Sequence, residues 1–255
     1  MRNPWQLYDE LIAGVPTGIG VRSYYLGDHW NYLEAECGVG VSRMVNGGAF
    51  ARDGRDACTL ELHEVAQWVK SWNFEEASLG LAALNAWYTQ PERLAENGLD
   101  IATGAGLGEN PFHSMRERYA GKKVVVVGHF PNVKGMAEIS DLTVLERDCQ
   151  SPLDTPDPAC EYLMSEQDYA FITGITLTNK TAPRLFELCA DVPVILTGPS
   201  AVAAPVLFER GVDVIAGSVV VDAETAMQAL RLGSHDLWRA GIKKFTWNRP
   251  DGVCA

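Results

Sequence analysis

The chain has 255 residues, of which 33 are Asp or Glu and 21 are Lys or Arg, so its formal net charge is −12 near neutral pH. An excess of negative charge argues against a protein that binds nucleic acid or an anionic membrane surface. Hydrophobic residues make up 47% of the sequence, which is enough for a sizeable core in one or two domains and too much for a disordered chain.

The compartment is predicted from what the sequence lacks. The amino-terminal residues have neither the basic start nor the apolar middle of a secretory signal. No apolar run approaches the roughly 18 residues of a membrane span. The six cysteines are scattered without paired spacing, which is typical of reduced thiols. We therefore expect a soluble, cytoplasmic protein.

The first part of the chain predicts a small α+β domain. Residues 3–14 predict a helix capped by Asn3. Residues 18–45 are rich in β-branched and aromatic residues broken by glycines, which predicts two or three antiparallel strands. Two helices are expected next, and in the second Asn73 is the cap and Asn85 lies beside a buried apolar stripe.

A glycine-rich segment predicts the connection between two domains. Residues 96–112 contain four glycines without flanking apolar periodicity. The G-x-G-x-G spacing at 104–108 is compatible with a phosphate loop, but no strand leads into it in a βαβ context, which favours a flexible linker. A short helix is expected from Asn110. The predicted domains are 1–109 and 110–255.

The second domain is predicted to be Rossmann-like. Apolar runs alternate with helical patterns, which is typical of a parallel sheet covered by helices on both faces. The expected strands span residues 124–130, 141–147, 168–177, 192–200 and 212–220. The expected helices span about residues 179–190, 201–210 and 223–232. Ligands of such sheets bind at the carboxyl ends of the strands, so the residues that follow each apolar run are the candidates for a site.

The first of these strands is followed by Gly128, His129, Phe130 and Pro131, where a dinucleotide-binding protein has G-x-G-x-x-G. The single glycine and the proline argue against a pyrophosphate cradle. His129 is suited to act as a base, a metal ligand or a hydrogen-bond donor to a ligand. The alternative is an ordinary polar loop residue.

Glu146 ends the second strand, 18 residues after Gly128. This is close to the roughly 20-residue offset at which an acidic side chain meets a ribose hydroxyl in nucleotide-binding folds, which leaves an adenosine-like ligand open. The alternative is a solvated carboxylate, or one that pairs with Arg147.

The third strand runs into a cluster of hydroxyl and amide side chains. Thr178 or Asn179 is the expected cap of the next helix, whose free N–H groups suit a phosphate or carboxylate, with Lys180 adding positive charge. Capping alone explains one hydroxyl but not the cluster. Its further members are Thr173, Gly174 and Thr176.

The last two strands also end in small polar residues. Gly198, Pro199 and Ser200 permit close approach of a ligand and hydrogen bonding to it, with ordinary turn chemistry as the alternative. Asp222 is expected to cap the helix that follows the fifth strand.

Five sequence features together resemble the putative heavy-metal chelation domain family. They are GLAALNAWY at 80–88, GHFP at 128–131, Glu146, TGITLTNKT at 173–181, and LTGPS at 196–200 followed by PVLFERGVDVIAGSVV. The resemblance spans most of the chain and implies an enolase-N-terminal-like domain, a Rossmann-like domain and a site between them. Carried over residue by residue, it implies that Asn85 lies beside His129, Glu146, Thr173, Asn179, Lys180 and Ser200.

The residues themselves give no preformed metal site. There is no C-x-x-C, no H-E-x-x-H and no acidic calcium loop, which argues against a zinc-type site. A heavy metal or metal complex bound through a chelating small molecule, or through His129 and carboxylates brought together by folding, stays open.

Two functions are expected, and their candidate residues are the same. The first is a metal-homeostasis protein that holds a metal, a metal complex or a small anionic ligand in the interdomain cleft. The second is an enzyme acting on a small anionic metabolite or nucleotide, with His129 or Glu146 as acid or base and Lys180 holding the anion. A third function, as a structural partner in an assembly, would leave the polar strand ends unexplained. We expect a homodimer only because homodimers are the commonest oligomers among soluble proteins. The candidate ligand-binding residues are Asn85, Gly128, His129, Phe130, Glu146, Thr173, Gly174, Thr176, Asn179, Lys180, Gly198, Pro199 and Ser200, with His129 also the candidate metal ligand.

Overall fold

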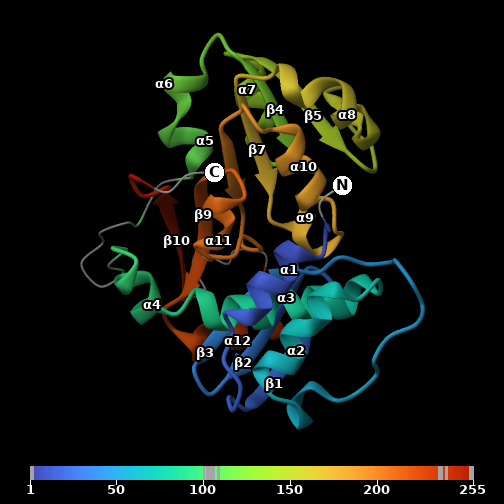
Figure 1. Ribbon diagram of the computed structural model, residues 1–255, viewed down its shortest axis with the longest axis vertical. Helices are drawn as coiled ribbons and strands as arrows, with labels where there is room; N and C mark the ends of the chain where they lie inside the picture. The colour runs from blue at the N-terminus through green and yellow to red at the C-terminus, as the bar shows by residue number, and fades with distance from the viewer. Residues whose placement is uncertain are drawn as a thin grey trace.

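The structure is a computed structural model that describes residues 3–99, 101, 107, 110–234, 238 and 241–252. Figure 1 shows a small sheet and its helices at one end of the long axis and a large sheet with its helices at the other. Most of the G-x-G-x-G segment at 104–108, within the predicted connection at 96–112, lies outside the described residues. Among the described residues, no helix has both the length and the apolar character needed to cross a membrane.

The amino-terminal part contains an antiparallel sheet of three strands in the order β1-β2-β3, which confirms the predicted strands. They are β1 (Val21–Leu26), β2 (Trp30–Ala35) and β3 (Gly38–Arg43). The helices are α1 (Gln6–Ala13), α2 (Leu62–Gln67), α3 (Phe74–Tyr88) and α4 (Pro91–Glu96), with short 3-10 turns η1 (Ala57–Thr59) and η2 (Trp68–Lys70).

The predicted cap of α3 is confirmed and that of α1 is wrong. Asn73 Oδ1 accepts a hydrogen bond from Glu76 N at 3.1 Å, as an N-cap does. Asn3 Oδ1 instead accepts from Trp5 N at 3.1 Å, and Trp5 occupies the N-cap position of α1. A turn at residues 3–5 therefore precedes the helix.

The carboxyl-terminal part contains a sheet of seven strands in the order β10-β9-β8-β7-β4-β5-β6, in which all neighbours are parallel except β9 and β10. The strands are β4 (Lys123–Val127), β5 (Asp141–Glu146), β6 (Asp154–Pro156), β7 (Tyr169–Thr173), β8 (Val194–Thr197), β9 (Val212–Val220) and β10 (Ile242–Asn248). The five predicted strands are confirmed, and β6 and β10 are additional.

The helices of this part are short. They are α5 (Pro111–Ser114), α6 (Arg116–Tyr119), α7 (Val133–Ala137), α8 (Cys160–Leu163), α9 (Ile175–Thr178), α10 (Ala182–Leu188), α11 (Val206–Glu209) and α12 (Ala223–Arg231), with the turns η3 (Asp157–Ala159) and η4 (Met164–Glu166). The expected cap of α12 is confirmed, because Asp222 Oδ1 accepts from Thr225 N at 3.1 Å. The short helix expected from Asn110 is α5, and Asn110 at its N-cap accepts from Phe112 N at 3.2 Å.

The predicted cap at Thr178 or Asn179 is wrong, as is the continuation of the third strand to residue 177. The strand β7 ends at Thr173, residues 175–178 form α9, and the next helix begins at Ala182 with Thr181 at its N-cap position. Proline is favoured in the first turn of a helix, and Pro183 in the first turn of α10 accounts for the later start.

Helices cover both faces of the large sheet, as the continuous apolar strands predict. Because side chains alternate along a strand, Val124 and Val126 pack with Phe112 of α5, whereas Val125 belongs to the opposite cluster, which includes Leu185 of α10 and Leu207 of α11.

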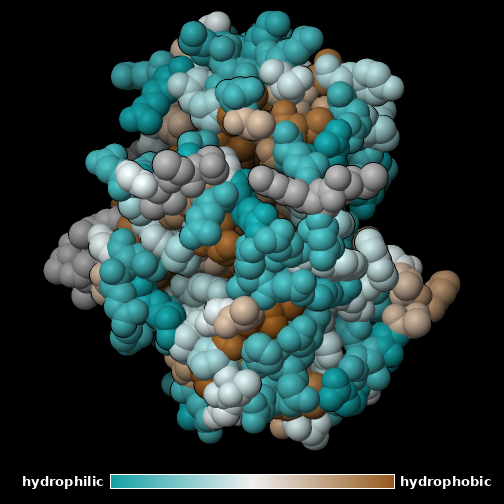
Figure 2. All heavy atoms as spheres, in the orientation of Figure 1, coloured by the Kyte–Doolittle hydropathy of each residue, from teal (hydrophilic) through white to brown (hydrophobic). Residues whose placement is uncertain are grey.

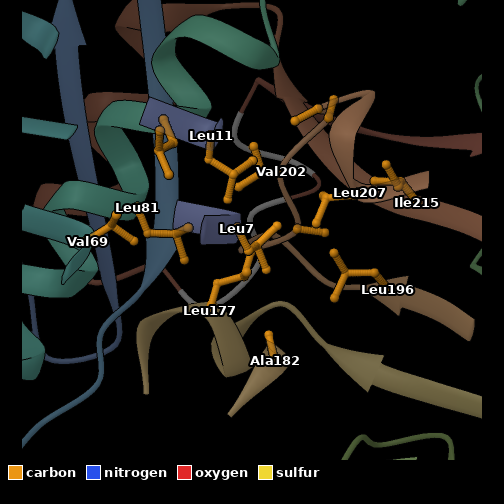
Figure 3. Packing of buried hydrophobic residues seen from close by; sticks show 14 of the residues in the cluster. Leu7, Leu11, Val69, Leu81, Leu177, Ala182, Leu196, Val202, Leu207 and Ile215 are labelled. Atoms are coloured by element: carbon orange, nitrogen blue, oxygen red, sulfur yellow. The ribbon is translucent and has the colours of Figure 1, made fainter. Parts of the chain in front are cut away.

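One apolar core joins the two parts of the molecule. Figure 3 shows Leu7 and Leu11 of α1 in one cluster with Leu177 of α9, Leu207 of α11 and Val202, which precedes α11. All of these side chains are buried. The amino-terminal part therefore packs tightly against the carboxyl-terminal part over α9 and the segment that follows β8.

Candidate functional site

The order of strands in the large sheet defines a crevice between β4 and β7. The chain passes from β4 to β5 and β6 on one side, and then returns to β7, β8 and β9 on the other. The connections that leave β4 and β7 therefore diverge from each other at the carboxyl ends of these strands. In open α/β sheets, ligands bind at such a topological switch point.

A cavity of about 490 Å³ lies at this position, within the range typical of small-molecule sites. The ends of β4, β5 and β7 meet there, and α9, α10 and the segment after β6 complete the wall. The lining residues are Val127, Gly128, Leu145, Glu146, Arg147, Asp157, Pro158, Cys160, Glu161, Thr173, Ile175, Thr176, Asn179, Lys180, Thr181, Arg184 and Leu185. Figure 2 shows apolar atoms within the hydrophilic surface of this end of the molecule.

Gly128 allows β4 and β7 to approach each other at the cavity. Its φ of +97° lies in the region that favours glycine, and a Cβ atom there would lie 3.1 Å from Thr173 Cγ2. Thr173 itself is engaged locally, because its carbonyl accepts from Thr176 Oγ1 at 2.7 Å. The glycine thus leaves the end of β4 open to the cavity.

His129, just after the end of β4, forms a close pair with Asp154 at the start of β6. The distance from His129 Nδ1 to Asp154 Oδ1 is 2.7 Å, and the exposed fractions of the two side chains are 36% and 1%. Because a carboxylate accepts hydrogen bonds, this pair places a proton on Nδ1, and a neutral imidazole then has its free lone pair on Nε2. A carboxylate that orients histidine in this way is common behind metal-bound imidazoles.

Asp154 is itself fixed by the loop before it. Its Oδ2 accepts from Gln150 N at 2.9 Å and from Ser151 N at 2.8 Å. Desolvation raises the pKa of Asp154, but the hydrogen bonds from Gln150 N, His129 and Ser151 N outweigh it, so the pKa is lower than the usual value. Asp154 is therefore an ionised group that keeps His129 in one orientation.

Glu146 faces the cavity with its carboxylate held by backbone groups. Oε2 accepts from His129 N at 2.9 Å, and Oε1 accepts from Arg147 N at 2.7 Å. The Arg147 guanidinium instead bonds Asp157, with Nε and Oδ2 3.0 Å apart. The predicted alternative, pairing of the Glu146 carboxylate with the Arg147 side chain, is therefore not what the structure shows.

Lys180 lines the cavity but also contacts the amino-terminal part. Its ammonium donates to the carbonyl of Ser71 and, at 2.6 Å, to that of Thr178, and it lies 5.7 Å from the ring centre of Trp72. Burial lowers the pKa of Lys180 to about 8, although the Glu76 carboxylate acts in the opposite direction. The charge is thus directed largely at backbone carbonyls in this structure.

Three of the candidate residues lie in the junction between the two parts. Asn85 Nδ2 donates to Val41 O at 2.8 Å and to Pro199 O at 3.3 Å. Ser200 Oγ accepts from Arg43 N at 2.8 Å, and a Cβ atom at Gly174 would lie 2.4 Å from Ala201 N. Asn85 and Ser200 thus join α3 and β3 to the loop after β8, and Gly174 packs closely against that loop.

A second cavity, of about 310 Å³, lies at the same edge of the sheet and takes in Phe130, Gly198 and Pro199. The first cavity takes in Gly128, Glu146, Thr173, Thr176, Asn179 and Lys180. The structure thus distributes twelve of the candidate residues over two cavities and one packed junction, whereas His129 lines neither cavity and pairs with Asp154. Asp154 was not anticipated, because β6 is three residues long and has no recognisable periodicity.

Among the residues that the structure describes, metal-ligating side chains do not form a complete site. In the part of the chain that the structure describes, no group of three or more His, Cys, Asp or Glu side chains is placed to hold a metal ion. Structural zinc sites usually take four protein ligands and catalytic sites three.

Comparison with known families shows where this arrangement belongs. Two family models, both described as "Putative heavy-metal chelation", match residues 8–88 and residues 110–240. The chain belongs to this family. The resemblance seen in the sequence and the predicted fold class, a small α+β part followed by a Rossmann-like part, are both confirmed.

Two crystal structures of family members are similar to this chain. A protein of unknown function from the DUF364 family of Desulfitobacterium hafniense DCB-2 is 33% identical, with a TM-score of 0.84 over 97% of this chain and 100% of that chain. A second DUF364 protein of unknown function, from Pyrococcus horikoshii, is 17% identical, with a TM-score of 0.77 over 96% of this chain and 99% of that chain, and supports the fold alone. No curated protein matches the chain.

Proposed function

We propose that this protein serves metal homeostasis by binding a metal as the complex of a small organic ligand. The ligand occupies the cavity at the ends of β4, β5 and β7, and His129 Nε2 coordinates the metal at its rim. The family description supports a role in metal chelation. The single observation that carries the proposal is the pair of His129 and Asp154, 2.7 Å apart. His129 follows Gly128 and donates its N–H to Glu146, and both of these residues line the 490 Å³ cavity.

The organic ligand is required by the shortage of protein donors. Among the described residues, no three suitable side chains converge on one point. A metal held by one imidazole alone would exchange rapidly with solvent, whereas a chelating molecule can fill the other coordination positions. The cavity supplies apolar surface and hydrogen-bonding groups for the organic part.

The first experiment is native mass spectrometry with elemental analysis on protein purified without chelators or affinity-metal steps. We expect a stoichiometric metal together with a small organic molecule. His129→Gln should lose the metal, because it removes the coordinating nitrogen. Asp154→Asn should weaken metal binding about 10- to 100-fold, the usual effect of removing the partner of a metal-bound histidine.

His113→Gln is the matched control, because His113 is exposed and lies on α5. It should retain the metal. Undiminished metal in folded His129→Gln would contradict the proposal. A metal-free protein that holds an organic anion, and changes it chemically on incubation, would instead support the second function, an enzyme that acts on a small anionic metabolite or nucleotide.

A further inference from the structure

We infer that the organic part of the ligand is a ribonucleoside, and that the Glu146 carboxylate holds its ribose cis-diol. The inference rests on the proposed function, because it names the class of ligand that the same cavity takes. The metal-binding groups of such a ligand would extend from the sugar towards His129, whose backbone N–H already donates to Glu146.

The position of Glu146 in the sheet is the first support. Glu146 ends β5, next to β4, and Gly128 N donates to Leu145 O at 2.9 Å, so Gly128 and Glu146 lie at the same level of the sheet edge. Both line the cavity, together with Thr173 at the end of β7. An acidic side chain at the end of the second strand, beside the switch point, is where sheets of this kind bind ribose hydroxyls.

The geometry of the carboxylate is the second support. Each of its oxygens accepts one backbone N–H, from His129 and from Arg147, and each keeps a further lone pair. Two neighbouring hydroxyls of a ribose can donate to these two oxygens together. Because Arg147 is paired with Asp157, its guanidinium does not compete for them.

The charge of the cavity wall is the third support. Arg147 pairs with Asp157, and Arg184 pairs with Glu161 at 2.6 Å. Of the described residues in the lining, this leaves one acidic and one basic side chain, Glu146 and Lys180, so their charges balance. Its apolar members, which suit a base and a sugar, are Val127, Leu145, Pro158, Ile175 and Leu185.

The same edge is poorly suited to a nucleoside diphosphate. Pro131 has no N–H to donate, and α7, which follows it, is five residues long. A pyrophosphate normally binds at a glycine-rich turn that opens a long helix. We therefore expect the nucleoside to contribute the affinity and a diphosphate to add none.

The test is calorimetric titration of metal-free protein with adenosine, guanosine, cytidine and uridine, each beside its 2′-deoxy and 3′-deoxy analogue. We expect at least one ribonucleoside to bind, and the loss of either hydroxyl to weaken it about tenfold or more, as for hydrogen bonds to a charged group. Glu146→Gln should reduce the difference between ribo and deoxy compounds, whereas Glu166→Gln, at an exposed position on η4, should leave it unchanged.

The analogues test the inference on the native protein, so it remains falsifiable if Glu146→Gln fails to fold. Absence of binding by all four ribonucleosides, or equal binding of ribo and deoxy forms, would overturn it. A protein that binds a metal complex but does not distinguish ribose from deoxyribose would contradict this inference and leave the proposed function standing. A protein that binds ribonucleosides specifically but never takes up metal would contradict the proposed function and leave this inference standing.

Discussion

Lys180 combines a strained backbone with a buried charge. Its φ of +68° is in the left-handed region, which costs a residue with a side chain roughly 1 kcal/mol. The ammonium reaches across to the carbonyl of Ser71 and lies 5.4 Å from the ring centre of Phe74. These contacts to the amino-terminal part hold the residue in a conformation that its own local sequence does not favour.

Stability should therefore depend on pH through Lys180. The pKa of Lys180 is about 8 in the folded protein, whereas the ordinary value of 10.5 applies in the unfolded chain. Between these two pH values, the unfolded chain therefore binds a proton that the folded chain does not. The unfolding free energy should then rise with pH from about 8 to 10.5, because the penalty for the buried charge is lost. Lys180→Met removes this dependence.

The measurement is urea unfolding of native protein and Lys180→Met at several pH values between 7 and 10.5. The difference in unfolding free energy should move in favour of the native protein as the pH rises. Parallel curves for the two proteins would show that the pKa of Lys180 is not lowered on folding.

At the scale of elements, α3 depends on small residues because it is enclosed on two sides. A Cβ atom at Gly40 of β3 would lie 2.1 Å from Ala82 O and from Ala86 N of α3. A Cβ atom at Gly80 of α3 would lie 2.1 Å from Val69 N of η2. The backbones approach so closely that only glycine fits, which explains the run of Gly and Ala in this helix.

Gly40→Ala should accordingly destabilise the protein by about 1–3 kcal/mol, since the clash is with backbone atoms that cannot turn aside. Gly135→Ala in α7 is the matched control, because a Cβ atom there has no neighbour within 4 Å. It should stabilise the protein by about 0.5–1 kcal/mol through helix propensity. Chemical denaturation measures both, and equal effects of the two substitutions would refute this account of the packing.

At the scale of the whole molecule, an apolar core lies in the junction between the two parts. Tyr8 Oη donates to Leu177 O at 2.9 Å, and burial raises the pKa of Tyr8. Around this bond, Leu7 and Leu11 pack with Val202 in one cluster. The candidate cavity lies beside this junction, and Lys180 connects the two through its bond to Ser71.

We therefore expect the full chain to unfold in one cooperative transition, and the proposed domains, 1–109 and 110–255, to be unstable apart. Separation would expose apolar side chains that the other part covers, including Leu177 and Val202. Thermal unfolding followed by circular dichroism tests this on the full chain and on each fragment. A separate 110–255 fragment that melts with the midpoint of the full chain would contradict it.

The sequence by itself determined the fold class, the five principal strands, the caps at Asn73 and Asp222, and the short helix that begins at Asn110. These features follow from hydrophobic periodicity and from side chains that bond backbone groups a few residues away, so short stretches of sequence contain the information. The family followed instead from a resemblance carried by motifs along most of the chain.

Only the tertiary structure decided the pairing of His129 with Asp154, the contact of Lys180 with Ser71, and the packing of Asn85 and Ser200 into the junction. The partners in these contacts lie from 25 to 157 positions apart in the sequence. Such contacts depend on how strands order themselves in a sheet and how the two parts pack, which no local pattern encodes. The same reason explains why the polar strand ends were found from the sequence but their division between two cavities and a packed junction was not.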